Sequence, residues 1–169
     1  MNLISDSTLG GRVVLLNDRE KAMFCYVDIS DFSNSLAVGQ PVIIRADGTY
    51  NAKAVKPETS SRFEDIGVFT GFPKGQMTGT KAAATADGYY LFYIVGKYQA
   101  LIDTSAGALT VGQPLKITNG GTAFVTVTSG KASDVGAIAI LSEEAEQDTA
   151  KANLKDVILS PLGAKGQIA

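Results

Sequence analysis

A tetrapeptide, VGQP, occurs twice in the chain and constrains the fold more than any other feature of the sequence. The first copy begins at Val38 and the second at Val111, which is an offset of 73 residues. The match continues without gaps, so that residues 38–49 and 111–122 are identical at seven of 12 positions. Self-similarity at a fixed long period is typical of chains built from structural repeats. The sequence therefore predicts a tandem duplication.

A second match sets the extent of the two copies. The sequence DIGV at residues 65–68 corresponds to DVGA at residues 134–137, at an offset of 69. Tracing the similarity backwards places the starts of the copies near Cys25 and Tyr98. We therefore expect an N-terminal arm over residues 1–24, a first β repeat over residues 25–97 and a second β repeat over residues 98–169.

Each copy carries the pattern of short strands separated by tight turns. Runs of β-prone residues follow Pro41 and Pro114, and a proline opens a strand or lies at a sheet edge. Asp47-Gly48 and Asn119-Gly120 then predict hairpin turns, because glycine and asparagine accept positive φ angles. The pattern predicts an all-β fold of two similar small antiparallel barrel or sandwich units with little helix. Further strands are expected at residues 67–70, 89–95, 100–103, 124–128, 136–141 and 156–160.

Two segments interrupt this strand pattern. Residues 71–88 are rich in glycine, alanine and threonine and show no periodicity, which predicts a projecting loop. Ser142 precedes a run of acidic residues, and this order suits the N-terminal cap and positive end of a short helix. We expect one or two helical turns over residues 142–151.

The absence of histidine excludes much of enzyme chemistry. Without an imidazole the chain cannot form a Ser-His-Asp or Cys-His nucleophile, nor most zinc sites. The single cysteine, Cys25, forms no disulfide within the chain and fits a reducing compartment. The acidic run at residues 143–148 lacks the glycine of a calcium loop, and residues 75–82 depart from the phosphate-loop spacing. We expect no enzymatic activity, no metal and no cofactor.

Charge and hydropathy exclude two further classes of partner. Fifteen basic and 17 acidic side chains give a net charge of -2, whereas proteins that bind nucleic acid usually carry a basic face. The most apolar run, residues 89–95, is far shorter than the roughly 20 residues that cross a bilayer. The first residues lack the pattern of a signal peptide. We expect a protein that is made in the cytoplasm and binds neither nucleic acid nor membrane.

The same apolar run is expected to be covered on both faces. In a strand, Tyr89 and every second residue up to Val95 share one face, while Tyr90, Phe92 and Ile94 share the other. Such a strand is either enclosed in the core or covered on one side by a partner subunit, and stacking on nucleic acid is the weaker explanation. Both alternatives stay open, and Tyr90 and Phe92 are candidate interface residues.

The N-terminal arm lies outside the repeat and is a candidate docking element. Its isolated apolar residues stand among serine, aspartate, threonine and glycine, so the segment cannot bury itself. Residues 13–16, VVLL, suit the addition of a strand to an exposed sheet edge, although they are equally suited to be the first strand of the chain's own barrel. The candidate partner contacts in the arm are Leu3, Ile4, Leu9, Val13 and Val14.

The repeated unit as a whole resembles the small β-barrel decoration proteins, also called cement or head-stabilising proteins, of tailed bacteriophages. The resemblance rests on VGQP with an Ile-containing strand, a Gly-Thr turn, and an IGV-like strand. In this chain it is carried by residues 38–48 with 65–71 and by residues 111–121 with 134–141, and it leaves out the arm. The chain departs from a typical single-unit member in being doubled.

The resemblance implies a non-enzymatic protein on the outside of a virion. Such a protein binds the major capsid protein and reinforces contacts between capsid subunits. Multivalent attachment to a symmetric shell leads us to expect a homo-oligomer, either a trimer or a dimer. The alternative is a carbohydrate- or surface-binding β module of a phage fibre or tail, and a barrel that binds single-stranded nucleic acid comes third.

Overall fold

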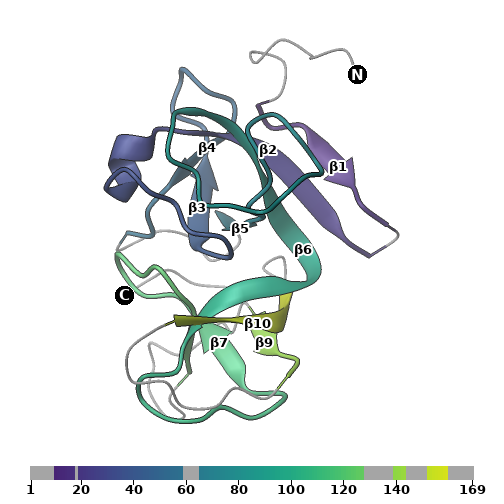
Figure 1. Ribbon diagram of the computed structural model, residues 1–169, viewed down its shortest axis with the longest axis vertical. Coiled ribbons are helices and arrows are strands. Elements are labelled where there is room, and N and C mark those ends of the chain that lie inside the picture. Colours follow the sequence, from purple (N-terminus) through teal and green to yellow (C-terminus); the bar gives the residue numbers. More distant parts are fainter. Residues whose placement is uncertain (1–9, 18, 59–64, 128–138, 144–151, 160–169) are drawn as a thin grey trace.

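The computed structural model describes residues 10–17, 19–58, 65–127, 139–143 and 152–159, in which strands and a short 3₁₀ helix are joined by turns (Figure 1). The predicted all-β class with little helix is confirmed. The strands are β1 (Val13–Leu15), β2 (Lys21–Val27), β3 (Pro41–Arg45), β4 (Lys53–Val55), β5 (Ile66–Phe69), β6 (Gly88–Asp103), β7 (Pro114–Lys116), β8 (Val125–Thr126), β9 (Ala139–Leu141) and β10 (Ala152–Leu159), and the 3₁₀ helix is η2 (Ile29–Phe32).

Five strands of the first unit close into a barrel. Strand β2 pairs with β4, β4 with β3, β3 with β5, β5 with β6, and β6 returns to pair with β2. All these pairs are antiparallel except β2 with β4, which run parallel. The long connection that contains η2 and β3 separates β2 from β4 and lets the chain return in the same direction. A closed ring of this kind leaves its strands without free edges.

The second unit repeats this order of pairing. The second half of β6 pairs with β10, β10 with β9, β9 with β7, and β7 with β8. A parallel bridge between Ile102 and Phe124 links the start of the β8 segment back to β6. Each strand of the five-strand ring thus has a counterpart in the second unit, whereas an origin by duplication stays a prediction. The match at residues 134–137 lies outside the described residues, as do residues 144–151 of the helix expected over 142–151.

Strand β6 belongs to both units and bends between them (Figure 1). The sequence predicts separate strands at residues 89–95 and 100–103, but β6 is continuous over 16 residues. The bend lies at Gly96, whose φ of +127° is rarely adopted by other residues. A Cβ at this position would lie 2.6 Å from Cγ of Glu20 and 2.8 Å from the hydroxyl oxygen of Tyr98. Glycine therefore bends β6 without ending it.

The first VGQP motif forms a tight turn that starts β3. The N–H of Gln40 donates to the carbonyl of Ala37 at 3.1 Å, and Gly39 has the φ of +79° that the third position of a type II turn requires. The Gln40 side-chain oxygen accepts from the Ala37 N–H at 3.2 Å. Gly39 and Gln40 also exchange backbone hydrogen bonds with Phe69 of β5. Gly39 and Gln40 thus form the turn, and Pro41 opens the strand.

The second VGQP motif makes the same contacts. The N–H of Gln113 donates to the carbonyl of Thr110 at 3.2 Å, and the Gln113 side chain accepts from the Thr110 N–H at 3.3 Å. Gly112 has a φ of +85°, and Gly112 and Gln113 exchange backbone hydrogen bonds with Leu141 of β9. The tetrapeptide is therefore a turn and strand-start signal that works identically in both units.

The strands pack through both of their faces. On β6, Tyr89, Leu91 and Tyr93 belong to the larger hydrophobic cluster, while Tyr90 and Phe92 belong to the smaller one. The larger cluster continues into the second unit, and the smaller one lies within the first. This division follows the alternation expected from the sequence for a strand that is covered on both sides.

The loop expected at residues 71–88 is present up to the start of β6, but its ends pack back onto the first unit and do not project. Ala84 exchanges two backbone hydrogen bonds with Leu36, at 2.9 and 3.0 Å. The N–H of Gly75 donates to the carbonyl of Tyr89 at 2.7 Å. The middle of the segment is exposed, but its backbone is anchored on either side.

Candidate functional site

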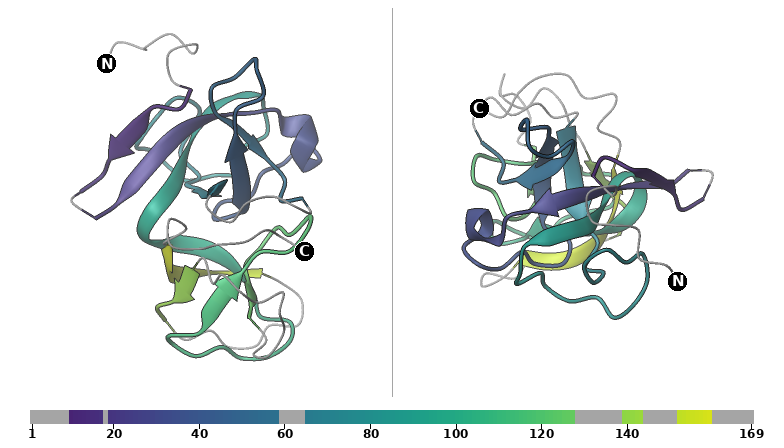
Figure 2. Two further views of the ribbon diagram at one scale, coloured as in Figure 1. Left: turned by 180° about the vertical axis from the view of Figure 1, so that it is seen from behind. Right: turned by 90° about the horizontal axis from the view of Figure 1, so that it is seen from above.

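The N-terminal hairpin of β1 and β2 is the most prominent projection from the first unit (Figure 2). Strand β1 pairs antiparallel with the first residues of β2 and is not a member of the five-strand ring. The Leu16 N–H donates to the Glu20 carbonyl at 2.9 Å, and the Asn17 side chain accepts from the Arg19 N–H, so that side-chain and backbone bonds both order the turn. The turn of the hairpin is therefore ordered by its own residues, while its second strand also pairs with β6.

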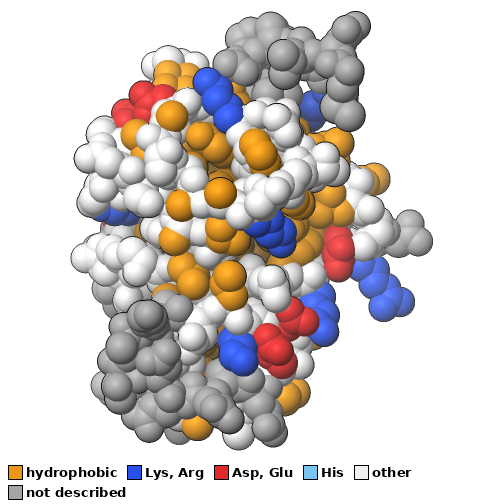
Figure 3. Space-filling view, in the orientation of Figure 1, with side chains coloured by type: hydrophobic (Ala, Val, Ile, Leu, Met, Phe, Trp, Pro, Cys, Tyr) orange, Lys and Arg blue, Asp and Glu red, His pale blue; other side chains and the backbone are white. Residues whose placement is uncertain are grey.

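The hairpin exposes apolar side chains beside an unpaired strand edge. Val13 and Leu15 are 48% and 70% exposed, and Leu16 is also exposed. Val14 points to the other face and packs against the larger cluster. Strand β1 ends the order of strands in the sheet, so in the described part of the chain its outer edge has no strand partner. We name Val13, Leu15 and Leu16 the hairpin surface, and Figure 3 shows hydrophobic side chains gathered on that side of the molecule.

The structure separates the predicted contact residues into three groups. Leu3, Ile4 and Leu9 lie outside the described residues. Val13 belongs to the hairpin surface, whereas Val14 is half-buried beneath it. Leu15 was not among the predicted contacts, although it shares the face of Val13 by simple alternation in a strand. That alternation is the signal that could have selected Leu15 instead of Val14.

The candidate interface residues on β6 are corrected by the structure. Phe92 is completely buried and Tyr90 almost completely buried within the chain. The Tyr90 hydroxyl donates to the carbonyl of Ala86 at 3.0 Å, and Phe69 packs against both rings. The core alternative therefore holds for these two residues, because the chain itself covers their face of β6.

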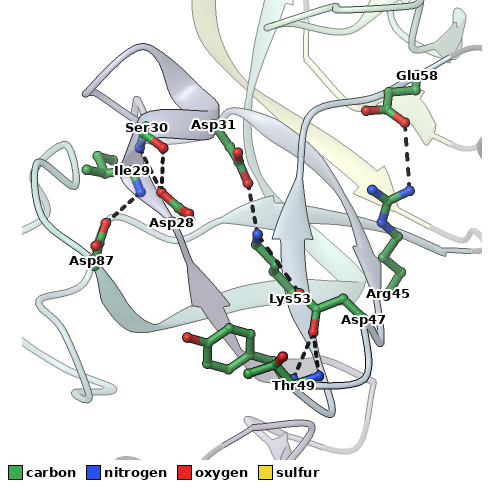
Figure 4. Close-up of polar contacts among 11 residues, drawn as sticks. Asp28, Ile29, Ser30, Asp31, Arg45, Asp47, Thr49, Lys53, Glu58 and Asp87 are labelled. Atoms are coloured by element: carbon green, nitrogen blue, oxygen red, sulfur yellow. Dashed lines mark hydrogen bonds and ion pairs between the residues drawn. The ribbon is translucent and has the colours of Figure 1, made fainter.

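A polar cluster fixes the turns at one end of the first unit (Figure 4). The Lys53 ammonium lies 3.2 Å from a carboxylate oxygen of Asp31 and 4.0 Å from one of Asp47. Burial lowers the pKa of Lys53, but the hydrogen bond to Asp31 and the nearby carboxylates outweigh it, so that the pKa lies above its ordinary value. A charged lysine in this position joins η2 to the turn between β3 and β4.

Neighbouring carboxylates of this cluster cap the 3₁₀ helix. Asp28 accepts from the N–H and hydroxyl of Ser30, and the hydroxyl bond is the main reason why the pKa of Asp28 is lowered. Asp87 accepts from the N–H of Ile29 at 2.8 Å. The described residues include no group of three or more acidic or cysteine side chains placed to hold a metal ion. The carboxylates of Asp28 and Asp87 thus hold the first residues of η2 in place.

Three tyrosines form an aromatic cluster close to these carboxylates. The rings of Tyr26 and Tyr50 stack with centroids 3.8 Å apart, and Tyr89 meets Tyr26 edge-on at 5.5 Å. The hydrogen bond with Tyr50, burial and the charges of Asp87 and Asp28 raise the pKa of Tyr26. Partly exposed rings beside carboxylates are groups that can stack on a sugar and bond its hydroxyls. This cluster is the feature that bears on the carbohydrate-binding alternative.

In the parts of the chain that the structure describes, no helix is long and apolar enough to cross a membrane. No known protein family and no curated protein matches the sequence. Among solved structures, the chain is similar to the N base of the head fiber protein gp8.5 of bacteriophage phi29. The two chains are 10% identical, and the alignment covers 86% of this chain and 97% of that chain with a TM-score of 0.44.

Proposed function

We propose that the chain is a capsid decoration protein, which binds the outer surface of a phage head and stabilises contacts between major capsid subunits. The resemblance of both repeats to such proteins supports the proposal. The observation that carries it is the hairpin surface, which presents exposed aliphatic side chains and an unpaired strand edge away from the barrel. The molecule has no enzymatic task in this proposal, and it lies on the capsid exterior after synthesis in the host cytoplasm.

Docking uses two features of the hairpin together. The outer edge of β1 accepts an extended segment of a capsid subunit through main-chain hydrogen bonds. The side chains of Val13 and Leu15 then lose their exposure to water, and complete burial of such side chains stabilises a contact by about 1.5–3 kcal/mol each. A contact of this size is weak alone. Many copies on a symmetric shell, held as trimers or dimers, make it strong through effective concentration.

The test compares two exposed apolar residues on different parts of the first unit. Leu15→Glu should abolish binding to purified capsids in a sedimentation assay, because it places a charge on the hairpin surface. Met77→Glu is the matched control, since Met77 is exposed on the segment between β5 and β6. It should bind as wild type does. Wild-type levels of binding by Leu15→Glu, or no binding by the unmodified protein, would overturn the proposal.

Removal of residues 1–11 tests the contribution of the arm. A docking arm loses capsid affinity while the melting temperature falls only slightly, because β1 begins at Val13 and the deletion removes the bond from the Gly11 N–H to the Phe24 carbonyl but leaves the strand itself. Normal binding by the truncated chain would limit docking to the hairpin. A much lower melting temperature would instead assign the arm to the fold.

The tyrosine cluster favours one second candidate, a carbohydrate-binding module of a phage fibre or tail. Tyr26 and Tyr50 are both partly exposed, and the charges of Asp28 and Asp87 act on Tyr26. Binding to an array of bacterial surface glycans, lost in Tyr26→Ala and retained in Leu15→Glu, would support this function. Failure to bind any glycan, together with binding to capsids, would reject it.

A further inference from the structure

A row of outward-facing side chains crosses the sheet of the second unit. Pro114 of β7 pairs with Ile140 of β9, Ile140 pairs with Ile158 of β10, and Ile158 pairs with Lys97 of β6. Paired residues in adjacent strands point to the same face of a sheet. The row is therefore a continuous stripe of proline and isoleucine that ends at a lysine.

This stripe is exposed. Ile140 and Ile158 are 44% and 46% exposed, and Leu154, on the same face of β10, is 41% exposed. Large aliphatic side chains scattered singly on a surface need no explanation, but neighbours that are in register form a patch. We name Pro114, Ile140, Leu154 and Ile158 the second-unit face.

In the first unit the corresponding row is covered. Pro41, Val68 and Tyr93 pair in the same way across β3, β5 and β6, and all three are buried. The segment that follows β5 lies over this row, with the Lys81 ammonium 5.8 Å from the centre of the Tyr93 ring. Tyr98 stacks on the same ring at 3.7 Å. In the first unit, a segment of the chain therefore shields this row of side chains from water.

The charges around the second-unit face favour a second copy as its cover. Lys97 and Asp156 lie 3.3 Å apart at its border. Two copies related by a two-fold axis can exchange these ion pairs around a shared apolar centre, so this part of the face is complementary to itself. Lys116 lies on the same side of β7 as Pro114 and adds a second cation at the opposite edge.

We infer that the second-unit face is the contact between two copies of this chain. The inference deepens the proposed function, since it assigns the expected homo-oligomer to a surface, but it does not require capsid binding. Strand spacing and rise give the face about 300 Å² on each copy. The total of about 600 Å² is below the roughly 1,200 Å² of stable complexes, so the dimer forms at high local concentration.

Sedimentation equilibrium from about 10 µM to about 1 mM tests this inference. The average mass of the wild-type chain should rise toward twice the monomer mass. Ile158→Glu should remain monomeric at every concentration, whereas Leu15→Glu, which alters the hairpin surface, should associate as wild type does. A monomeric wild-type chain at the highest concentration, or unchanged association of Ile158→Glu, would overturn the inference.

Charge reversal makes the test independent of any folding defect in Ile158→Glu. Lys97→Asp and Asp156→Lys should each associate more weakly than wild type, because each places like charges across the two-fold axis. An equimolar mixture should recover association, since each contact between unlike chains then joins opposite charges. If the mixture associates no more strongly than either variant alone, the exchange of ion pairs is contradicted.

Hydrogen exchange of the wild-type chain distinguishes the other occupants of the face. Protection of β9 and β10 that grows with concentration supports the dimer. Protection that is the same at every concentration is explained by the sheet hydrogen bonds of the single chain, and it overturns the inference. Protection that appears only after capsids are added assigns the face to the capsid and also overturns it. Loss of capsid binding by Leu15→Glu is a separate result and bears only on the proposed function.

Discussion

Replacement of Gly39 by alanine should destabilise the protein more than the same change at Gly112. Both glycines occupy the same turn position, with φ angles of +79° and +85°. The surroundings differ. A Cβ at Gly39 would lie 3.0 Å from the backbone nitrogen of Leu101 and 2.4 Å from Cδ2 of Leu154, while a Cβ at Gly112 meets nothing within 4 Å among the described residues. The repeat thus supplies its own matched control.

The expected magnitudes follow from two separate costs. A residue other than glycine in a left-handed conformation costs about 1–2 kcal/mol, and this applies to both variants. The side chain of Leu154 can move aside because it is partly exposed, but the Leu101 N–H donates to the Gly39 carbonyl at 2.8 Å. Displacing that bond costs about 0.5–1.5 kcal/mol more. Gly39→Ala should therefore lose about 1.5–3.5 kcal/mol and Gly112→Ala about 1–2 kcal/mol.

Urea unfolding of the two variants measures the difference directly. At about 2–4 °C per kcal/mol for a chain of this length, the melting temperatures should also differ by a few degrees. Exchange of the Leu101 amide hydrogen should accelerate in Gly39→Ala and stay unchanged in Gly112→Ala. Equal losses of stability, or a larger loss in Gly112→Ala, would show that the first turn does not depend on its contact with the second unit.

Three further predictions concern the first unit. Phe92→Ala should lower the free energy of unfolding by about 3–5 kcal/mol in urea titrations, because the ring is fully buried and leaves a cavity; a loss below about 1 kcal/mol would contradict the packing. The Tyr50 N–H holds the pKa of Asp47 below its ordinary value. The ionised Asp47 carboxylate therefore stabilises the fold above about pH 4, and this contribution declines as the pH falls through the lowered folded pKa. Asp47→Asn should flatten the dependence of melting temperature on pH between about 5 and 2.5, and an unchanged slope would refute the assignment. Burial raises the pKa of the Cys25 thiol, so a thiol reagent at pH 8 should label the chain only after unfolding, and rapid labelling of the folded protein would exclude this burial.

The strand starts could be predicted because their signals are local. A proline after a Gly-Gln pair fixes both the turn and the first residue of a strand, and the structure begins β3 at Pro41 and β7 at Pro114. Asp47-Gly48 likewise forms the expected turn, in which the Asp47 side chain accepts from two backbone N–H groups. Signals of this kind need no knowledge of distant residues.

Features that depend on distant contacts could not be predicted in the same way. Gly96 and Lys97 interrupt the apolar pattern of β6 and suggest a break, yet pairing with β10 carries the strand through both residues. The burial of Phe92 is decided by Phe69, which lies 23 residues earlier in the chain. Ile158 was expected in a strand, but its exposure depends on what the rest of the chain places over that strand.

The bend of β6 at Gly96 also determines how the two units act together. When two units are joined by a flexible linker, binding by one unit does not fix the position of the other. The effective concentration of the second unit at its own target is then low. Here a single strand runs through both units, and the hydrogen bond from Leu101 to Gly39 ties them at a second point. The hairpin surface and the second-unit face are therefore carried at one fixed separation and angle. A dimer joined through its second-unit faces would therefore present its two hairpin surfaces at one fixed separation, so that a lattice of matching spacing can engage both surfaces and a lattice of different spacing only one.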